Sequence, residues 1–263
     1  MPRFAANLSF LYQEAPFLER FKRAAEDGFG AVEYVSPYEF DKYVVAEALR
    51  DAGIEQALFN LPAGNWASGE RGIACLPERV DEFKAGVDKA IEYARALDGS
   101  MLNCLAGLAP EGADPQRLDD TLIANLAYAA PRLADAGIAL VIEPINTRDM
   151  PGFHVSRTDH AERLLDAVGS DNLKIQYDFY HMQVMQGDLL PTFERLQHRI
   201  GHVQIADNPG RNEPGTGEIN YQTIFSTLDG LGYSGWVGCE YKPFAGTSQG
   251  LGWMKPYLED KHI

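Results

Sequence analysis

Basic side chains are scarce in this sequence. Its 263 residues include 23 Lys and Arg against 38 Asp and Glu, which gives a formal net charge of -15. A field of this sign repels phosphate backbones and argues against a nucleic acid as partner. It also means that a site for an anionic substrate must supply its own local positive charge.

Cysteine is also rare. The three cysteines form no C-x-x-C pair, so the sequence predicts no disulfide framework. Cys104 and Cys239 lie in apolar runs, where a buried and unreactive thiol is the expected state.

Long hydrophobic runs are missing. No segment approaches the roughly 20 apolar residues that a membrane-spanning helix needs. The first residues, MPRFAANLSFLYQEAPF, lack the apolar core and small-residue cleavage site of a signal peptide. We therefore expect a cytoplasmic protein with no membrane partner, and the sequence is compatible with a homo-oligomer.

The chain instead repeats one unit, in which a helical segment ends in Gly and a short β-rich run follows. Gly suits the left-handed conformation that closes a helix, and the short runs are rich in Val, Ile and Leu, as in buried parallel strands. A first run at residues 4–8 brings the number of predicted strands to eight. The other seven phrases are DGFGAVEYV (27–35), DAGIEQALFN (51–60), DGSMLNCLAG (98–107), DAGIALVIEPI (135–145), VGSDNLKIQYD (168–178), RIGHVQIAD (199–207) and LGYSGWVGCEY (231–241).

Amphipathic helices are predicted between these runs. Residues 78–98, for example, place Phe83, Val87 and Ile91 on one face with charges opposite. Pro131 should kink or restart the helix predicted at 115–135. The remaining helices are expected at 16–27, 41–52, 158–168, 188–199 and 220–231, with 251–258 as a candidate eighth.

Regular strand–helix alternation indicates a parallel sheet covered by helices. Eight units in a chain of this length fit a closed barrel better than an open Rossmann sheet. No linker or composition change divides the chain. We predict a single (β/α)₈ TIM-barrel domain over residues 1–263.

Reaction sites of such barrels lie at the carboxyl ends of the strands. Four consecutive predicted strands each carry an oxygen-bearing side chain there. The four are Glu143 in LVIEPI, Asp178 at the end of KIQYD, Gln204 in HVQIAD and Glu240 in WVGCEY. Three buried carboxylates repel one another unless a cation joins them, and an all-oxygen set suits Mg²⁺ or Mn²⁺ better than zinc or copper.

Each of these residues alone also has an ordinary structural interpretation. A strand-end Asp or Glu often caps a helix or forms a surface ion pair, and Gln204 could bind loop backbone. The four together, on adjacent strands at similar depth, favour the metal site.

Four further residues are candidates for substrate binding. His181 follows Asp178 by three positions, at the start of a predicted loop, and a structural role there is as plausible as a functional one. Arg71 lies in the Gly-rich segment 60–77, which is long enough to form a lid. Arg71 could bind a substrate carboxylate or simply be solvated. Arg211 and Lys242 follow two of the predicted ligand strands and are anion-binding candidates, whereas GTG at 215–217 is more typical of a plain turn.

The sequence resembles the hydroxypyruvate isomerases and, more broadly, the xylose-isomerase-like barrels. The resemblance covers essentially the whole chain. It is carried by RFAANLSFLY, NLPAGNWASGERGIACLP, IEPINTRDMPGFH, KIQYDFYHMQ, HVQIADNPGRNEPGTGEINY and GWVGCEYKP. The 2-oxotetronate isomerases share most of these motifs, but the ASGERGIAC loop is more similar to that of the hydroxypyruvate enzymes.

The resemblance implies roles for the residues singled out above. Glu143, Asp178, Gln204 and Glu240 match the family's metal site, and Glu143 and Glu240 also match its two catalytic acids. His181 matches the histidine of a D-x-x-H pattern that contacts substrate in related sugar epimerases. Those epimerases have His where Gln204 stands, so their metal preference does not transfer directly.

The implied reaction interconverts hydroxypyruvate and tartronate semialdehyde through an enediolate. The metal would stabilise that intermediate while one glutamate removes a proton and the other returns one. Two other classes compete with this interpretation. Metal-dependent endonucleases share the superfamily, but the net charge and the few His ligands argue against one. A sugar-acid binding protein would need no second carboxylate opposite the first.

Overall fold

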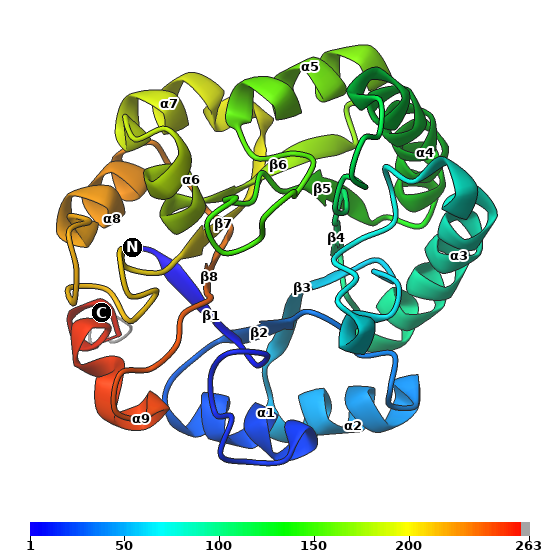
Figure 1. The fold of residues 1–263 in the computed structure, drawn as a ribbon. Helices are drawn as coiled ribbons and strands as arrows, with labels where there is room; N and C mark the ends of the chain where they lie inside the picture. Colours follow the sequence, from blue (N-terminus) through cyan, green and yellow to red (C-terminus); the bar gives the residue numbers. More distant parts are fainter. Residues whose placement is uncertain (259–263) are drawn as a thin grey trace.

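The eight predicted strands form a closed, all-parallel barrel in chain order. The computed structural model describes residues 1–258, and helices surround the barrel (Figure 1). Each short apolar run became a strand, which confirms the predicted fold class. The strands are β1 (Arg3–Asn7), β2 (Ala31–Tyr34), β3 (Glu55–Asn60), β4 (Met101–Cys104), β5 (Ala139–Ile142), β6 (Leu173–Asp178), β7 (Ile200–Ile205) and β8 (Trp236–Cys239).

The helices lie outside the strands and bury their apolar faces against them. In α3, the predicted face residues Phe83 and Val87 are buried. All three cysteines are free and buried, which was expected for Cys104 and Cys239. The helices are α1 (Phe17–Glu26), α2 (Lys42–Ala52), α3 (Val80–Leu97), α4 (Pro115–Asp135), α5 (Thr158–Val168), α6 (Phe179–Met185), α7 (Leu189–Leu196), α8 (Tyr221–Gly230) and α9 (Thr247–Gly250).

Two local expectations need correction. His181 lies in the short helix α6 and not in a loop, because Asp178 caps that helix directly after β6. The helix predicted at 251–258 is not formed, because these residues form two 3₁₀ turns, Leu251–Trp253 and Lys255–Tyr257, after the short helix α9. The helix α4 runs unbroken through Pro131, so of the two expected effects, a kink or a restart, the restart does not occur.

Two irregularities in the barrel adjoin buried polar residues. The β2–β3 register shifts between Val32 and Glu33, and the β6–β7 register shifts between Ile175 and Gln176. Glu33 and Gln176 are almost completely buried. Irregularities of this kind redirect side chains, and here each one lies beside a polar residue that is buried inside the barrel.

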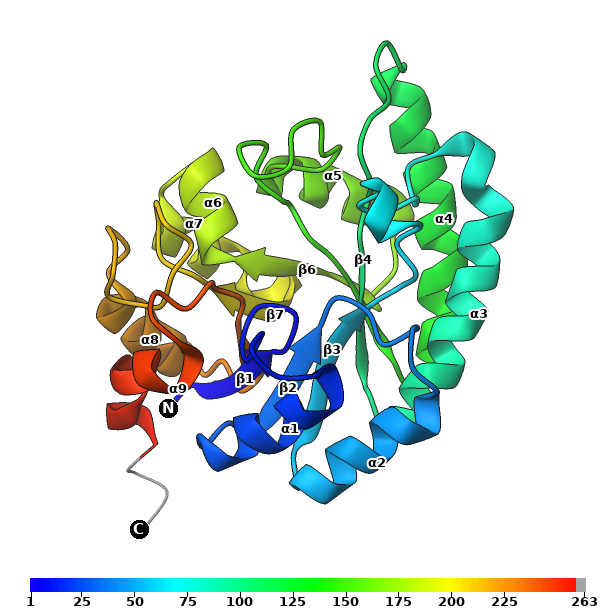
Figure 2. The same cartoon turned by 60° about the horizontal axis from the view of Figure 1, so that its bottom comes forward.

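The segments that follow β3, β4 and β5 lie against one another (Figure 2). Gly72 pairs with Ala106, and Leu108 pairs with Phe153, both in isolated antiparallel bridges. None of the helices described over residues 1–258 is long and apolar enough to cross a membrane.

Candidate active site in the barrel

A cavity of about 50 Å³ lies among the residues that follow the strands. Glu143, His181, Gln204, Arg211 and Glu240 all line it. A single water molecule needs about 10–15 Å³ of such space, so the cavity suits a compact ligand. These five residues lie on or after strands β5 to β8, His181 in helix α6 and Arg211 in the loop after β7, as expected for a barrel reaction site.

Three carboxylates meet beside this cavity. Donor atoms of Glu143, Asp178, His181 and Glu240 all lie within 4.8 Å of one another. Glu143 Oε1 and Asp178 Oδ2 are buried and have no hydrogen-bond partner among the described residues. Unpartnered buried carboxylate oxygens are costly, so the arrangement calls for a proton or a cation at their meeting point.

Burial raises the pKa values of all three acids, and neighbouring carboxylates add to each shift. Burial raises the pKa of Glu143 well above its ordinary value, and Glu240 and Asp178 raise it further. Burial likewise raises the pKa of Glu240, although Arg211 opposes the shift. Burial raises the pKa of Asp178 to about 6, against the effect of Arg211 and of two backbone N–H groups. Strongly perturbed acids in one cavity are typical of a functional site.

Asp178 has two roles in this structure. Its Oδ1 accepts hydrogen bonds from the backbone N–H groups of Tyr180 and His181, which caps α6. Its Oδ2 is left beside the other acids. The alternative structural interpretation, a helix cap, is therefore correct for one oxygen, while the second oxygen remains available.

His181 is oriented by the loop after β5. Its Nδ1 lies 2.6 Å from Nδ2 of Asn146, and its Nε2 lies 3.6 Å from Glu143 Oε1 and 3.7 Å from Asp178 Oδ2. Burial lowers its pKa well below the ordinary value, and Arg211 adds to this. A neutral imidazole therefore faces the carboxylates.

Gln204 lines the cavity but is also hydrogen-bonded to other polar residues that are buried in the barrel. Its Nε2 donates to Glu33 Oε1 and its Oε1 accepts from Gln176, both at 2.6 Å. These hydrogen bonds hold the Gln204 side chain in place. Its amide oxygen has a second lone pair, which remains available to coordinate a cation.

Arg211 supplies the local positive charge that the sequence required. Its guanidinium is nearly buried, pairs with Glu240, and lies 3.6 Å from Asp149 Oδ2. Its Nε is buried without a partner among the described residues. Its φ of 54° is unusual for a residue other than Gly, and its carbonyl accepts from Lys242 N at 2.7 Å.

The other two predicted cations lie elsewhere. The Arg71 side chain stacks on Trp66, with Cζ 4.1 Å from the ring centroid, and donates to the carbonyls of Trp66 and Glu70. Trp66, and not Arg71, lines the cavity. Lys242 is exposed and lines a neighbouring hollow with Phe10.

Sequence reasoning missed the polar residues beneath the acids. Asn7 Nδ2 donates to Glu240 Oε1 at 3.1 Å and to Glu33 Oε1 at 3.0 Å. Asn103 Nδ2 donates to Glu143 Oε2 at 3.2 Å. These residues interrupt the apolar runs RFAAN, AVEY and MLNC, and such interruptions are the signal that could have revealed them.

The donor set fits a divalent cation. Two carboxylate oxygens lack partners among the described residues, the three acids repel one another, and the neutral imidazole and the amide of Gln204 adjoin them. One positive charge, Arg211, offsets only part of the negative charge. Oxygen-rich sets of this kind suit hard ions.

A closed parallel barrel with paired acids and one buried arginine at its strand ends defines a TIM-barrel enzyme. The chain belongs to the xylose isomerase-like TIM barrel family, which matches residues 21–257, and it is an isomerase of that family.

Relatives cover nearly the whole chain. It is 53% identical to the hydroxypyruvate isomerase of Escherichia coli (strain K12), over 98% of this chain and 100% of the relative. It is 50% identical to the 2-oxo-tetronate isomerase of Cupriavidus necator, over 98% and 99%. A crystal structure of a protein named AP endonuclease, family 2, from Brucella melitensis superimposes with a TM-score of 0.95 at 48% identity and covers 98% of this chain and 99% of that one.

Proposed function

We propose that this enzyme interconverts hydroxypyruvate and tartronate semialdehyde, with Glu143 and Glu240 as the two proton-transfer groups. The observation that carries the proposal is the meeting of these two glutamates, both with raised pKa values, at one small cavity that also contains Arg211. Paired acids suit a reaction that removes one proton and returns another. The relative of 53% identity supports the choice of substrate.

Arg211 would bind the substrate carboxylate. Its Nε is a buried donor without a partner among the described residues, and it lines the cavity beside Glu240. A guanidinium binds a carboxylate with charge-assisted hydrogen bonds. Such binding would place the carbons of a short acid between Glu143 and Glu240.

The proton transfers balance within the substrate. One glutamate takes a proton from the hydroxymethyl carbon, and the electron pair of that C–H bond forms the carbon–carbon double bond of an enediolate. The other glutamate donates a proton to the former ketone carbon, and the hydroxyl proton moves from the terminal oxygen to its neighbour. The terminal carbon then carries the aldehyde.

The hydrogen bonds distinguish the two glutamates. Glu240 accepts from Arg211 and Asn7, which stabilise its ionised form. Glu143 accepts from the neutral amide of Asn103, and its pKa is well above the ordinary value. We assign Glu240 as the base and Glu143 as the acid in the direction that starts from hydroxypyruvate.

Glu143, Asp178, Gln204 and Glu240 would hold the metal, with His181 beside them. A bound Mg²⁺ or Mn²⁺ would act as a Lewis acid that draws electron density from the substrate carbonyl. The cytoplasm remains the expected location.

Deuterium exchange in heavy water tests the two roles separately. Glu240→Gln should lose about 10²- to 10⁴-fold in turnover and should not exchange the hydroxymethyl hydrogens of hydroxypyruvate. Glu143→Gln should lose turnover similarly but still exchange those hydrogens, because the base remains. The exposed Glu111→Gln is the matched control and should behave as wild type. Normal turnover by Glu240→Gln would remove it from the mechanism.

A second candidate substrate is 2-oxotetronate, on which the Cupriavidus necator relative is named as acting. It has one more carbon and the same reacting groups, so parallel assays with both substrates are required. A higher kcat/KM for 2-oxotetronate would transfer the assignment to it.

DNA cleavage is not proposed for this chain, although the similar Brucella melitensis protein is named an AP endonuclease. The net charge of -15 opposes binding to a phosphate backbone. Cleavage of DNA at abasic sites would contradict this, and failure to exchange substrate hydrogens would favour a binding protein instead.

A further inference from the structure

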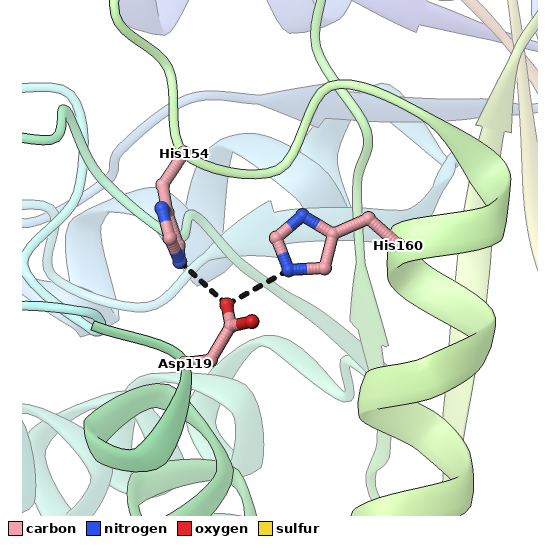
Figure 3. A group of neighbouring side chains, drawn as sticks. All are labelled: Asp119, His154 and His160. Carbon is pink, nitrogen blue, oxygen red and sulfur yellow. Dashed lines mark hydrogen bonds and ion pairs between the residues drawn. The ribbon is translucent and has the colours of Figure 1, made fainter. Parts of the chain in front are cut away.

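A second group of metal-type side chains lies outside the cavity (Figure 3). Asp119, His154 and His160 place their donor atoms within 4.8 Å of one another. Both imidazoles approach the same oxygen, Asp119 Oδ1, through Nε2 at 2.7 and 2.8 Å. We propose that this cluster binds a divalent transition-metal ion such as Zn²⁺ or Co²⁺, separately from the site in the barrel.

The three donors come from different parts of the chain. Asp119 lies on α4, His154 lies in the segment between β5 and α5, and His160 lies on α5. The two imidazole rings are 5.3 Å apart and inclined at 79°, so their Nε2 atoms converge without stacking. Because three separate elements each place a ligand atom at this point, a bound ion would link them.

The donor set differs from that of the barrel. Two imidazoles and one carboxylate suit Zn²⁺, Co²⁺ or Ni²⁺, whereas the barrel set is rich in oxygen. The exposed fractions of the side chains are 24% for Asp119, 7% for His154 and 17% for His160, which leaves an approach for the ion and for a completing water.

An ion at this site would hold the segment between β5 and α5 against its neighbours. His154 N donates to the carbonyl of Gly107, and the carbonyl of the next residue, Val155, accepts from Ile145 N at 3.0 Å. Ile145 lines the cavity two residues after Glu143. The ion would therefore link α4 and α5 to the segment between β5 and α5, and its role would be to stabilise the structure.

Cobalt loading tests the site directly. The chelator-treated full chain is incubated with Co²⁺ and desalted, and its cobalt content and visible spectrum are measured. Wild type should retain one more equivalent than His160→Gln or Asp119→Asn, and the variants should lack its cobalt–imidazole absorption. The exposed His198→Gln is the matched control and should retain the wild-type content.

Asp119→Asn is the sharper variant because Asn can still accept hydrogen bonds from both imidazoles. A metal site should lose Co²⁺ affinity by at least about tenfold on this change. Isomerase turnover with saturating Mg²⁺ should be retained, because the barrel acids are intact. Equal cobalt content in wild type and both cluster variants would overturn the proposal and identify a hydrogen-bonded cluster only.

Discussion

At the scale of single residues, we propose that recognition of the substrate's negative charge depends on Arg211. It is the predicted cation that lines the cavity, whereas Arg71 stacks on Trp66 and Lys242 is exposed. Arg211→Gln should raise KM for the acid by about 10- to 100-fold, since a hydrogen bond to a charged group contributes about 1.5–3 kcal/mol. It should also lower kcat, because Glu240 loses its main compensating charge.

Arg71→Gln and Lys242→Gln are the matched controls, and each should change KM by less than about threefold. Steady-state kinetics of the three variants test which of these side chains binds the substrate carboxylate. A larger effect at Arg71 or Lys242 than at Arg211 would show that the loops rearrange around substrate.

Gly238 makes room for the buried carboxylate of Glu33. A Cβ at this position would lie 2.3 Å from both Glu33 oxygens. Glu33 in turn accepts from Asn7, His202 and Gln204. Gly238→Ala should therefore reduce the free energy of unfolding by about 1–3 kcal/mol and impair turnover by moving Asn7 away from Glu240.

The control is Gly230→Ala at the end of α8, where a Cβ would meet nothing within 4 Å. Urea unfolding of both variants measures the difference. A Gly238→Ala protein as stable as Gly230→Ala would show that Glu33 is not confined as described.

The meeting of the three acids could be predicted from the sequence because the strand ends of a parallel barrel converge. Glu143, Asp178 and Glu240 lie at or just after strand ends, and the barrel geometry brings their oxygens together. Glu33 and Asn103 lie within short strands, and which barrel face they occupy depends on register. The β2–β3 shift beside Glu33 is not visible in the sequence.

At the scale of elements, the segment 60–77 closes one side of the cavity. Its 3₁₀ turn, Trp66–Ser68, places Trp66 in the lining while the residue remains 39% exposed. The predicted lid function rests on this ring. Trp66→Ala should raise KM about tenfold, the equivalent of roughly 1.4 kcal/mol of lost contact, whereas Trp66→Phe should stay near wild type.

Steady-state kinetics of both variants test the lid. An unchanged KM in Trp66→Ala would mean that the segment does not contact substrate.

Elements were predictable where a long amphipathic pattern or a Gly-ended helix marked them. The helix α6 was missed because the residues directly after Asp178 were expected to form a loop, although Asp178 caps a helix there. The prediction of a last helix at 251–258 was wrong because Gly252 and Pro256 divide this segment into separate 3₁₀ turns. The Arg71 and Lys242 positions depend on loop conformation, which strand and helix patterns do not determine.

At the scale of the whole molecule, metal binding should depend on pH. Asp178 has a pKa raised to about 6, and the pKa values of Glu143 and Glu240 are raised as well. A cation must displace their protons, so affinity should increase from about pH 5.5 to about pH 7.5, by up to tenfold per pH unit for each proton released. Mn²⁺ titrations at these pH values measure it.

The stability of the metal-free protein should respond in the opposite sense. A raised carboxyl pKa contributes stability that is fully present below the ordinary value of 3.8 and is lost as pH rises through about 6. Asp178→Asn should weaken both dependences. A Mn²⁺ affinity that is flat across this range would contradict protonated acids in the metal-free cavity.

The most direct test of the account is hydrogen exchange by the whole enzyme with hydroxypyruvate in heavy water, followed by NMR before and after chelation. The account predicts that deuterium enters substrate and product only when Mg²⁺ or Mn²⁺ is present. It also predicts that Asp178→Asn requires far more metal for the same rate. Undiminished exchange in the fully chelated enzyme would contradict the claim that these acids work around a shared cation.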